Sequence, residues 1–243
     1  MLGEWRERSS RRGLKLRPSD GPRKNPVTPH QAAQRMVPHD RLPPLSPAEH
    51  IMAMPAQRAP HRRWTEEEFY AARDAAPPGE RWELVDGVVL VTPAPHWMHQ
   101  RIIGRLFELV APYVRLQALG ETFLSPLDVK LEPGLVLQPD LLVVPAGELR
   151  RRSDAIRRLL LAVEIVSPTS ARHDRVRKRP HYQRNRVPQY WIVDDMSQTV
   201  ERWTPDDERP ELIAETLIWH PAGATDSFVL DLVQFFKDVA AED

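Results

Sequence analysis

A glutamate stands inside the most apolar segment of the chain. The run Leu159–Val163 leads into Glu164, and Ile165 and Val166 follow it. This pattern predicts a strand over Leu160–Val166 with the acid in its interior. A buried carboxylate costs several kcal/mol unless it is paired, protonated or bound to a cation. Any fold of this chain must therefore bring a counter-charge, a proton or a metal ion to Glu164.

A second acid repeats this pattern. Asp140 follows Pro139 and precedes Leu141–Val144, in a strand predicted over Val136–Val144. If the two strands are neighbours, the acids face each other, and like charges at that range require a divalent cation or a shared proton. The chain has no cysteine, so a metal would bind oxygen or imidazole. Carboxylate oxygens of this kind suit Mg²⁺ or Mn²⁺.

A lysine follows in a basic segment. Lys178 lies 14 residues after Glu164, and a helix is predicted over Asp174–Arg186. Asp174, Lys178 and Tyr182 are spaced four residues apart on one helical face, which could point at the two acids. Two other interpretations stay open: each acid forms a buried salt bridge with an arginine, and Lys178 is a solvated helix charge.

The remaining pattern predicts an α/β protein with a mixed sheet. A capping box at Thr65 begins a short helix, and Asp86-Gly87 marks a hairpin that places Glu83 on a strand. A long amphipathic helix runs through Ile102–Val114 to a C-cap at Gly120. The other expected elements are strands over Leu127–Leu131, Tyr190–Val193 and Thr199–Trp203 and a closing segment over Phe228–Phe236.

The first 60 residues differ in composition from the rest. They hold 10 of the 25 prolines and 11 Lys and Arg against 5 Asp and Glu, which leaves 23 basic and 29 acidic residues beyond. We expect residues 1–60 to be a disordered basic extension and residues 61–243 to be the folded domain. The extension could bind nucleic-acid phosphates, be an inert leader, or precede a true start at Met36, Met52 or Met54.

No segment predicts export or a membrane span. The longest apolar run, Leu159–Val163, is far shorter than the roughly 20 residues that cross a bilayer, and no apolar stretch follows Met1. We therefore expect a soluble, cytoplasmic protein.

Several motifs occur in an order that resembles a known family. They are Trp82–Gly87, Pro93–Pro95 and His99, then Gln138–Asp140 and Val163–Ser170, then Asp174 with Lys178 and Tyr182, and finally Val187–Asp194. Across residues 64–236 the chain resembles a large, largely uncharacterised bacterial family described as restriction endonucleases, within the PD-(D/E)XK nuclease superfamily. The resemblance implies a restriction-endonuclease-like core, with a mixed sheet flanked by helices and an N-terminal hairpin.

The same resemblance implies a set of site residues. Asp140, Glu164 and the backbone carbonyl of Ile165 would bind Mg²⁺. In the simplest superfamily pattern a lysine stands two residues after the glutamate, where this chain has Val166, but the family moves it to the following helix, at Lys178. That lysine would orient and help deprotonate the attacking water and balance charge on the phosphate.

Three further residues match the family pattern as auxiliary candidates. Glu83 is expected to have an auxiliary metal or structural function. His99 is expected to form hydrogen bonds at a helix N-terminus or to act in catalysis. Tyr182 would share the helical face of Lys178.

Two residues depart from that pattern. Pro180 would remove a hydrogen bond and clash with the preceding turn, at about 3 kcal/mol in a helix interior, and a kink there would displace Lys178 or Tyr182. Arg186 stands where the family usually has a helix-ending glycine, and left-handed geometry costs an arginine roughly 1 kcal/mol. We expect Asn185 to take the cap instead.

The leading hypothesis is an endonuclease that hydrolyses DNA phosphodiesters with a water activated on Mg²⁺, and the resemblance suggests a homodimer. A second hypothesis is a catalytically inactive nucleic-acid-binding or regulatory module with the same fold. A third is a structural protein whose acids are salt-bridged. No recognition helix or aromatic platform in the sequence indicates a base preference.

Overall fold

The computed structural model of the protein describes residues 63–92, 96–151, 155–166 and 170–241. The expected extension over residues 1–60 and its alternative starts lie outside these residues, as do Pro93–Pro95 and Ser167–Thr169 of the family motifs. No helix in the described part of the chain combines the length and apolarity needed to cross a membrane.

A six-stranded mixed sheet organises these residues, as predicted, with strand order β3-β4-β5-β6-β7-β8. Neighbouring strands are antiparallel except β5 and β6, which are parallel. A parallel pair needs a crossover connection, which the helical segment His173–Arg184 supplies. The strands are Gly120–Leu124 (β3), Leu141–Pro145 (β4), Leu161–Val166 (β5), Tyr190–Asp194 (β6), Thr199–Trp203 (β7) and Glu211–Ile213 (β8).

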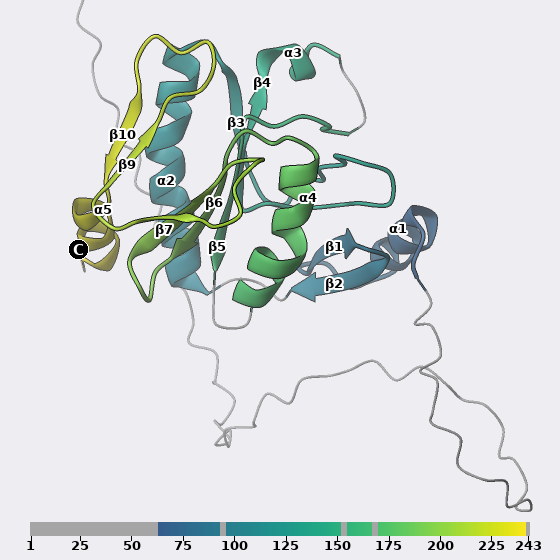
Figure 1. The fold of residues 1–243 in the computed structure, drawn as a ribbon. Coiled ribbons are helices and arrows are strands. Elements are labelled where there is room, and N and C mark those ends of the chain that lie inside the picture. Colours follow the sequence, from purple (N-terminus) through teal and green to yellow (C-terminus); the bar gives the residue numbers. More distant parts are fainter. Residues whose placement is uncertain (1–62, 93–95, 152–154, 167–169, 242–243) are drawn as a thin grey trace, which may run out of the picture. The chain divides into compact units, whose positions relative to one another are not determined.

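Helices cover both faces of this sheet (Figure 1). The predicted long helix, α2 (Trp97–Leu116), lies on one face, and α4 (Arg179–Arg184) lies on the other. Odd-numbered residues of β5 join the core under α2, and its even-numbered apolar residues join the core that contains Tyr182 of α4. Because side chains alternate along a strand, Glu164 points to the α4 side.

The predicted N-terminal hairpin is present and is tied to the chain just before Asp140. Asp86 and Gly87 both have positive φ, which a two-residue type I′ turn requires. The backbone of Leu84 exchanges hydrogen bonds of 2.8 and 3.0 Å with Val136, so the hairpin lies beside the segment that leads into Asp140. The elements are β1 (Arg81–Val85), β2 (Val88–Thr92) and, before them, α1 (Glu66–Asp74), which begins at the predicted Thr65 capping box.

Three predictions around β4 were wrong. Asp140 precedes the strand instead of lying within it, because Pro139 has no N–H for the ladder and pairing begins only at Leu141. Leu127–Leu131 is not a strand, and only Val129 forms isolated bridges there. Gly120 is not a helix cap: α2 ends at Leu116, and Gly120 opens β3, a strand that the sequence pattern did not predict.

The closing segment has more structure than predicted. Phe228–Asp231 forms β10, which pairs with β9 (Thr216–Trp219). Asp231 then caps α5 (Leu232–Ala240), accepting a 2.9 Å hydrogen bond from the Gln234 N–H. The strands β8 and β9 were not predicted, because three and four residues are too short for a clear alternation.

The helical segment with Pro180 includes a π-helix just before the proline. Residues His173–Lys178 form this wider helix, η1, and Pro180 falls in the first turn of α4, where its missing N–H is tolerated. The Arg175 carbonyl instead accepts a 3.0 Å hydrogen bond from Arg179 Nε. Asn185 is the C-cap residue, yet Arg186 still adopts the left-handed geometry, with φ of 55°.

We expect opposite effects from two glycine-to-alanine substitutions. A Cβ at Gly120 would lie 1.9 Å from the Val144 carbonyl oxygen, whereas one at Gly104, inside α2, meets nothing within 4 Å. Gly120→Ala should lower the free energy of unfolding by about 1–3 kcal/mol or more. Gly104→Ala should raise it by about 0.5–1 kcal/mol. Urea unfolding of both variants measures this, and equal stabilities would contradict the close approach of Gly120 to the backbone of β4.

Candidate active site

The two predicted acids meet across the β4–β5 pair. Leu141 pairs with Val163 in antiparallel register, so Asp140 and Glu164 occupy the next opposed position on one face. Asp140 is 2% exposed and Glu164 1%. Both side chains are therefore buried on the same face of the sheet.

Lys178 contacts three buried acids. Its Nζ lies 2.7 Å from Glu83 Oε2, 3.0 Å from Glu164 Oε1 and 3.1 Å from Asp174 Oδ1. The contact with Glu164 is a hydrogen bond, whereas Asp174 Oδ1 has no hydrogen-bond partner and is held by charge alone. The hydroxyl of Tyr182 donates a further 3.3 Å hydrogen bond to Glu164 Oε1.

Asp140 is the fourth buried acid of the cluster and has a separate set of partners. Its Oδ1 accepts a hydrogen bond from the Arg81 guanidinium and lies 3.3 Å from His99 Nε2. Its Oδ2 accepts a 2.7 Å hydrogen bond from the Ile165 N–H. The helix N-terminal role considered for His99 belongs instead to His96, whose ring accepts from the Met98 N–H.

The charges in this cluster shift several pKa values. Burial raises the pKa of Glu164 well above its usual value; the charge of Lys178 opposes this shift, and the charges of Asp174, Asp140 and Glu83 add to it. Burial alone would lower the pKa of Lys178, but the same carboxylates raise it well above the ordinary value. Lys178 is therefore held as a cation.

Asp140 is shifted in the opposite direction. Burial alone would raise its pKa, but the hydrogen bond from His99 and the charge of Arg81 outweigh burial and lower the pKa below the usual value. Glu164 and Asp140 thus differ in proton affinity although they face each other. Of the two side chains, Glu164 has the higher pKa.

The cluster fits a divalent cation. Its four acids exceed its two permanent cations, Arg81 and Lys178, by two charges when all are ionised. Glu164 Oε2 is buried with no hydrogen-bond partner, and such an oxygen calls for a proton or a cation. Among the described residues no three His, Asp or Glu side chains form a ready metal-binding group. Mg²⁺ is nevertheless commonly held by one or two carboxylates while it keeps several waters.

A family model described as "Uma2: Putative restriction endonuclease" matches residues 66–232. The chain belongs to this family. A crystal structure of "a putative nuclease belonging to DUF820 from Anabaena variabilis ATCC 29413" is similar, with a TM-score of 0.60 and 21% sequence identity. The match covers 72% of this chain and 98% of that chain and supports the nuclease-like fold. No curated protein matches the chain.

In this Uma2 chain the fold brings together every side chain predicted for the site. These are Asp140, Glu164, Lys178, Glu83, His99 and Tyr182. Sequence reasoning did not assign Arg81 and Asp174 to the site. Both had a signal: Arg81 lies two residues before Glu83 on the same strand face, and Asp174 was noted on the helical face of Lys178.

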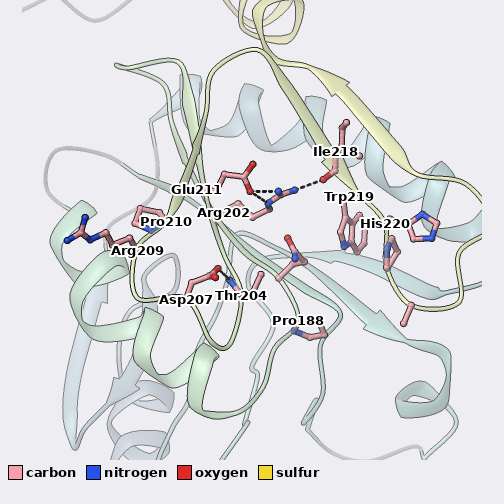
Figure 2. Close-up of a pocket in the computed structure, with 13 residues that line it drawn as sticks. Pro188, Arg202, Thr204, Asp207, Arg209, Pro210, Glu211, Ile218, Trp219 and His220 are labelled. Carbon is pink, nitrogen blue, oxygen red and sulfur yellow. Dashed lines mark hydrogen bonds and ion pairs between the residues drawn. The ribbon is translucent and has the colours of Figure 1, made fainter.

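Figure 2 shows a pocket of about 660 Å³ that is lined by a different set of residues. Arg202 there donates to Glu211 Oε2 and to the Ile218 carbonyl oxygen. Its charged group is thus already paired, and none of the buried acids around Lys178 lines this pocket. We place the candidate chemistry in the carboxylate cluster, where shifted pKa values and an unpartnered oxygen coincide.

We expect Glu164→Gln to stabilise the metal-free protein increasingly as pH rises. Because the folded state raises the Glu164 pKa, its contribution to stability is complete below the unfolded value of about 4.3 and is lost as pH rises toward the folded value. The amide does not titrate, so the difference in Tm between variant and wild type should grow between about pH 5 and about pH 8.

Thermal unfolding in a chelator measures this difference. Glu201→Gln is the matched control, since Glu201 is also a buried acid but pairs with Arg175 at 2.5 Å. A Glu164→Gln variant that becomes relatively less stable with rising pH would show that Glu164 is an ordinary ion-pair partner.

Proposed function

We propose that the chain is a metal-dependent endonuclease that hydrolyses DNA phosphodiester bonds. The observation that carries this proposal is the opposed pair of Asp140 and Glu164, with one Glu164 oxygen left unpartnered. Family membership supports nuclease activity in general terms. When bound, Mg²⁺ or Mn²⁺ would supply Lewis acidity and lower the pKa of a water molecule.

Asp140 and Glu164 are the proposed metal ligands, with the Ile165 carbonyl as a third. The Ile165 N–H already fixes Asp140 Oδ2 at 2.7 Å, which orients that carboxylate toward β5. A metal ion would also remove the need for Glu164 to carry a proton. This exchange of a proton for a cation makes binding favourable as pH rises.

Lys178 has the proposed role of a fixed positive charge. The resemblance implies that this lysine helps to deprotonate the attacking water, but its pKa is raised well above the ordinary value, so we propose no proton transfer to it near neutral pH. It can balance negative charge that develops on a phosphate. Glu83 and Tyr182 hold the Lys178–Glu164 pair in place, and His99 orients Asp140.

In this proposal, DNA as the substrate rests on the family description, and a homodimeric assembly rests on the family resemblance alone. The competing function is a nucleic-acid-binding module without turnover. It would bind Mn²⁺ or nucleic acid and leave every DNA and RNA intact. Nicking of supercoiled plasmid and of a labelled RNA therefore separates the two functions.

Substitutions of the two acids should abolish cleavage and leave the fold intact. We expect Asp140→Asn and Glu164→Gln each to reduce plasmid nicking by at least about 100-fold, because each removes a ligand of the ion that stabilises the transition state. Glu201→Gln should retain nicking near the wild-type rate. Circular dichroism checks the fold, and cleavage that survives both substitutions would reject the assigned site.

Cleavage should depend on a divalent cation. Treatment with a chelator should stop nicking, and added Mg²⁺ or Mn²⁺ should restore it. Mn²⁺ should also raise the Tm of the wild type, since a ligand that binds only the folded state stabilises it. Glu164→Gln should lose this increase. Cleavage that continues in chelator would contradict the proposal.

A further inference from the structure

Arg81 contacts the Asp140 oxygen, Oδ1, that also faces His99. Its guanidinium donates to Oδ1, while Oδ2 accepts the hydrogen bond from Ile165. Both oxygens of Asp140 are thus already bonded to protein donors. A cation that binds Asp140 through Oδ1 must compete with Arg81, which contacts that oxygen together with His99.

Arg81 and His99 are also the members of the cluster that reach solvent. Each has a side chain that is 17% exposed, whereas the side chains of Asp140, Glu164 and Lys178 are 1–3% exposed. Anything that approaches the acids from solvent therefore meets Arg81 and His99 first. Both lie on the Oδ1 side of Asp140.

The hydrogen-bonding capacity of the two permanent cations differs. The ammonium of Lys178 is enclosed by Glu83, Glu164 and Asp174, and its side chain is only 2% exposed. A guanidinium has five N–H donors, and in the described part of the chain Arg81 uses them on Asp140 alone. Guanidinium geometry suits two parallel hydrogen bonds to a phosphate. Arg81 is the cation with donors left for a ligand.

We propose that Arg81 is a substrate-contacting residue, which leaves Asp140 when a divalent cation binds there and donates hydrogen bonds to the nucleic-acid phosphate. This inference rests on the proposed function. Asp140 would then have a positively charged partner throughout, first the Arg81 guanidinium and then the metal ion. Arg81 would also stay close to Glu83 and Glu164, whose negative charges raise its pKa and stabilise its charged form.

The first test uses Mn²⁺ alone. Because Arg81 competes with the cation, Arg81→Gln should lower the midpoint of a Mn²⁺ titration, followed by the increase in Tm, at least several-fold. Arg81→Lys keeps the charge and the fold and should remain near the wild type. The matched control is Arg73→Gln, since Arg73 pairs with Asp128 at 2.8 Å outside the cluster. An Arg81→Gln midpoint equal to or above that of the wild type would overturn the competition.

The second test is single-turnover cleavage of a short DNA duplex at saturating Mg²⁺. Loss of a donor to the developing phosphate charge should slow Arg81→Gln by about 100-fold, with partial recovery in Arg81→Lys and wild-type rates in Arg73→Gln. Wild-type rates in Arg81→Gln would overturn the phosphate contact. If the wild type does not cleave the duplex, both the proposed function and the phosphate contact are rejected. The competition between Arg81 and the cation at Asp140 is decided separately, by the Mn²⁺ titration.

Discussion

The pairing of β4 with β5 is the constraint on which the site depends. With Leu141 opposite Val163, Asp140 and Glu164 must face each other on the side of the sheet that α4 covers. Two buried acids at that range are unstable without compensation. The hairpin supplies Arg81, and η1 supplies Lys178. A shift of one residue in the register would turn one acid to the opposite face and leave these cations without their partners.

The positive charges in the cluster do not fully balance its buried carboxylates, and this imbalance leaves the cluster able to bind a cation. Lys178 and Arg81 leave two negative charges unbalanced, and Glu164 responds with a raised pKa and an unpartnered oxygen. A structural ion network would gain stability from full pairing. A binding site instead keeps capacity for its ligand. The distribution of partners at Glu164 and Asp140 therefore favours a cation site over the purely structural interpretation.

The sequence identified the central residues because burial of an acid is visible as a pattern. Glu164 in its apolar run and Asp140 before Leu141–Val144 could each be recognised from neighbours along the chain. The four-residue spacing of Lys178 and Tyr182 suggested that both side chains share one helical face. Both do contact Glu164, although the first part of the expected α-helix is a π-helix. Arg81 could not be assigned in the same way. Its place on the strand face of Glu83 is visible in the sequence, but its contact with Asp140 depends on Leu84 pairing with Val136, a contact between distant segments.

The central claim is that the carboxylates of Asp140 and Glu164 form a site for one divalent cation. A crystal soaked with Mn²⁺ and measured at the manganese absorption edge tests this directly. We predict an anomalous difference peak within bonding distance of both carboxylates, with the Arg81 guanidinium displaced from Asp140. A map without such a peak, in which Arg81 still bonds Asp140 at saturating Mn²⁺, would contradict the account.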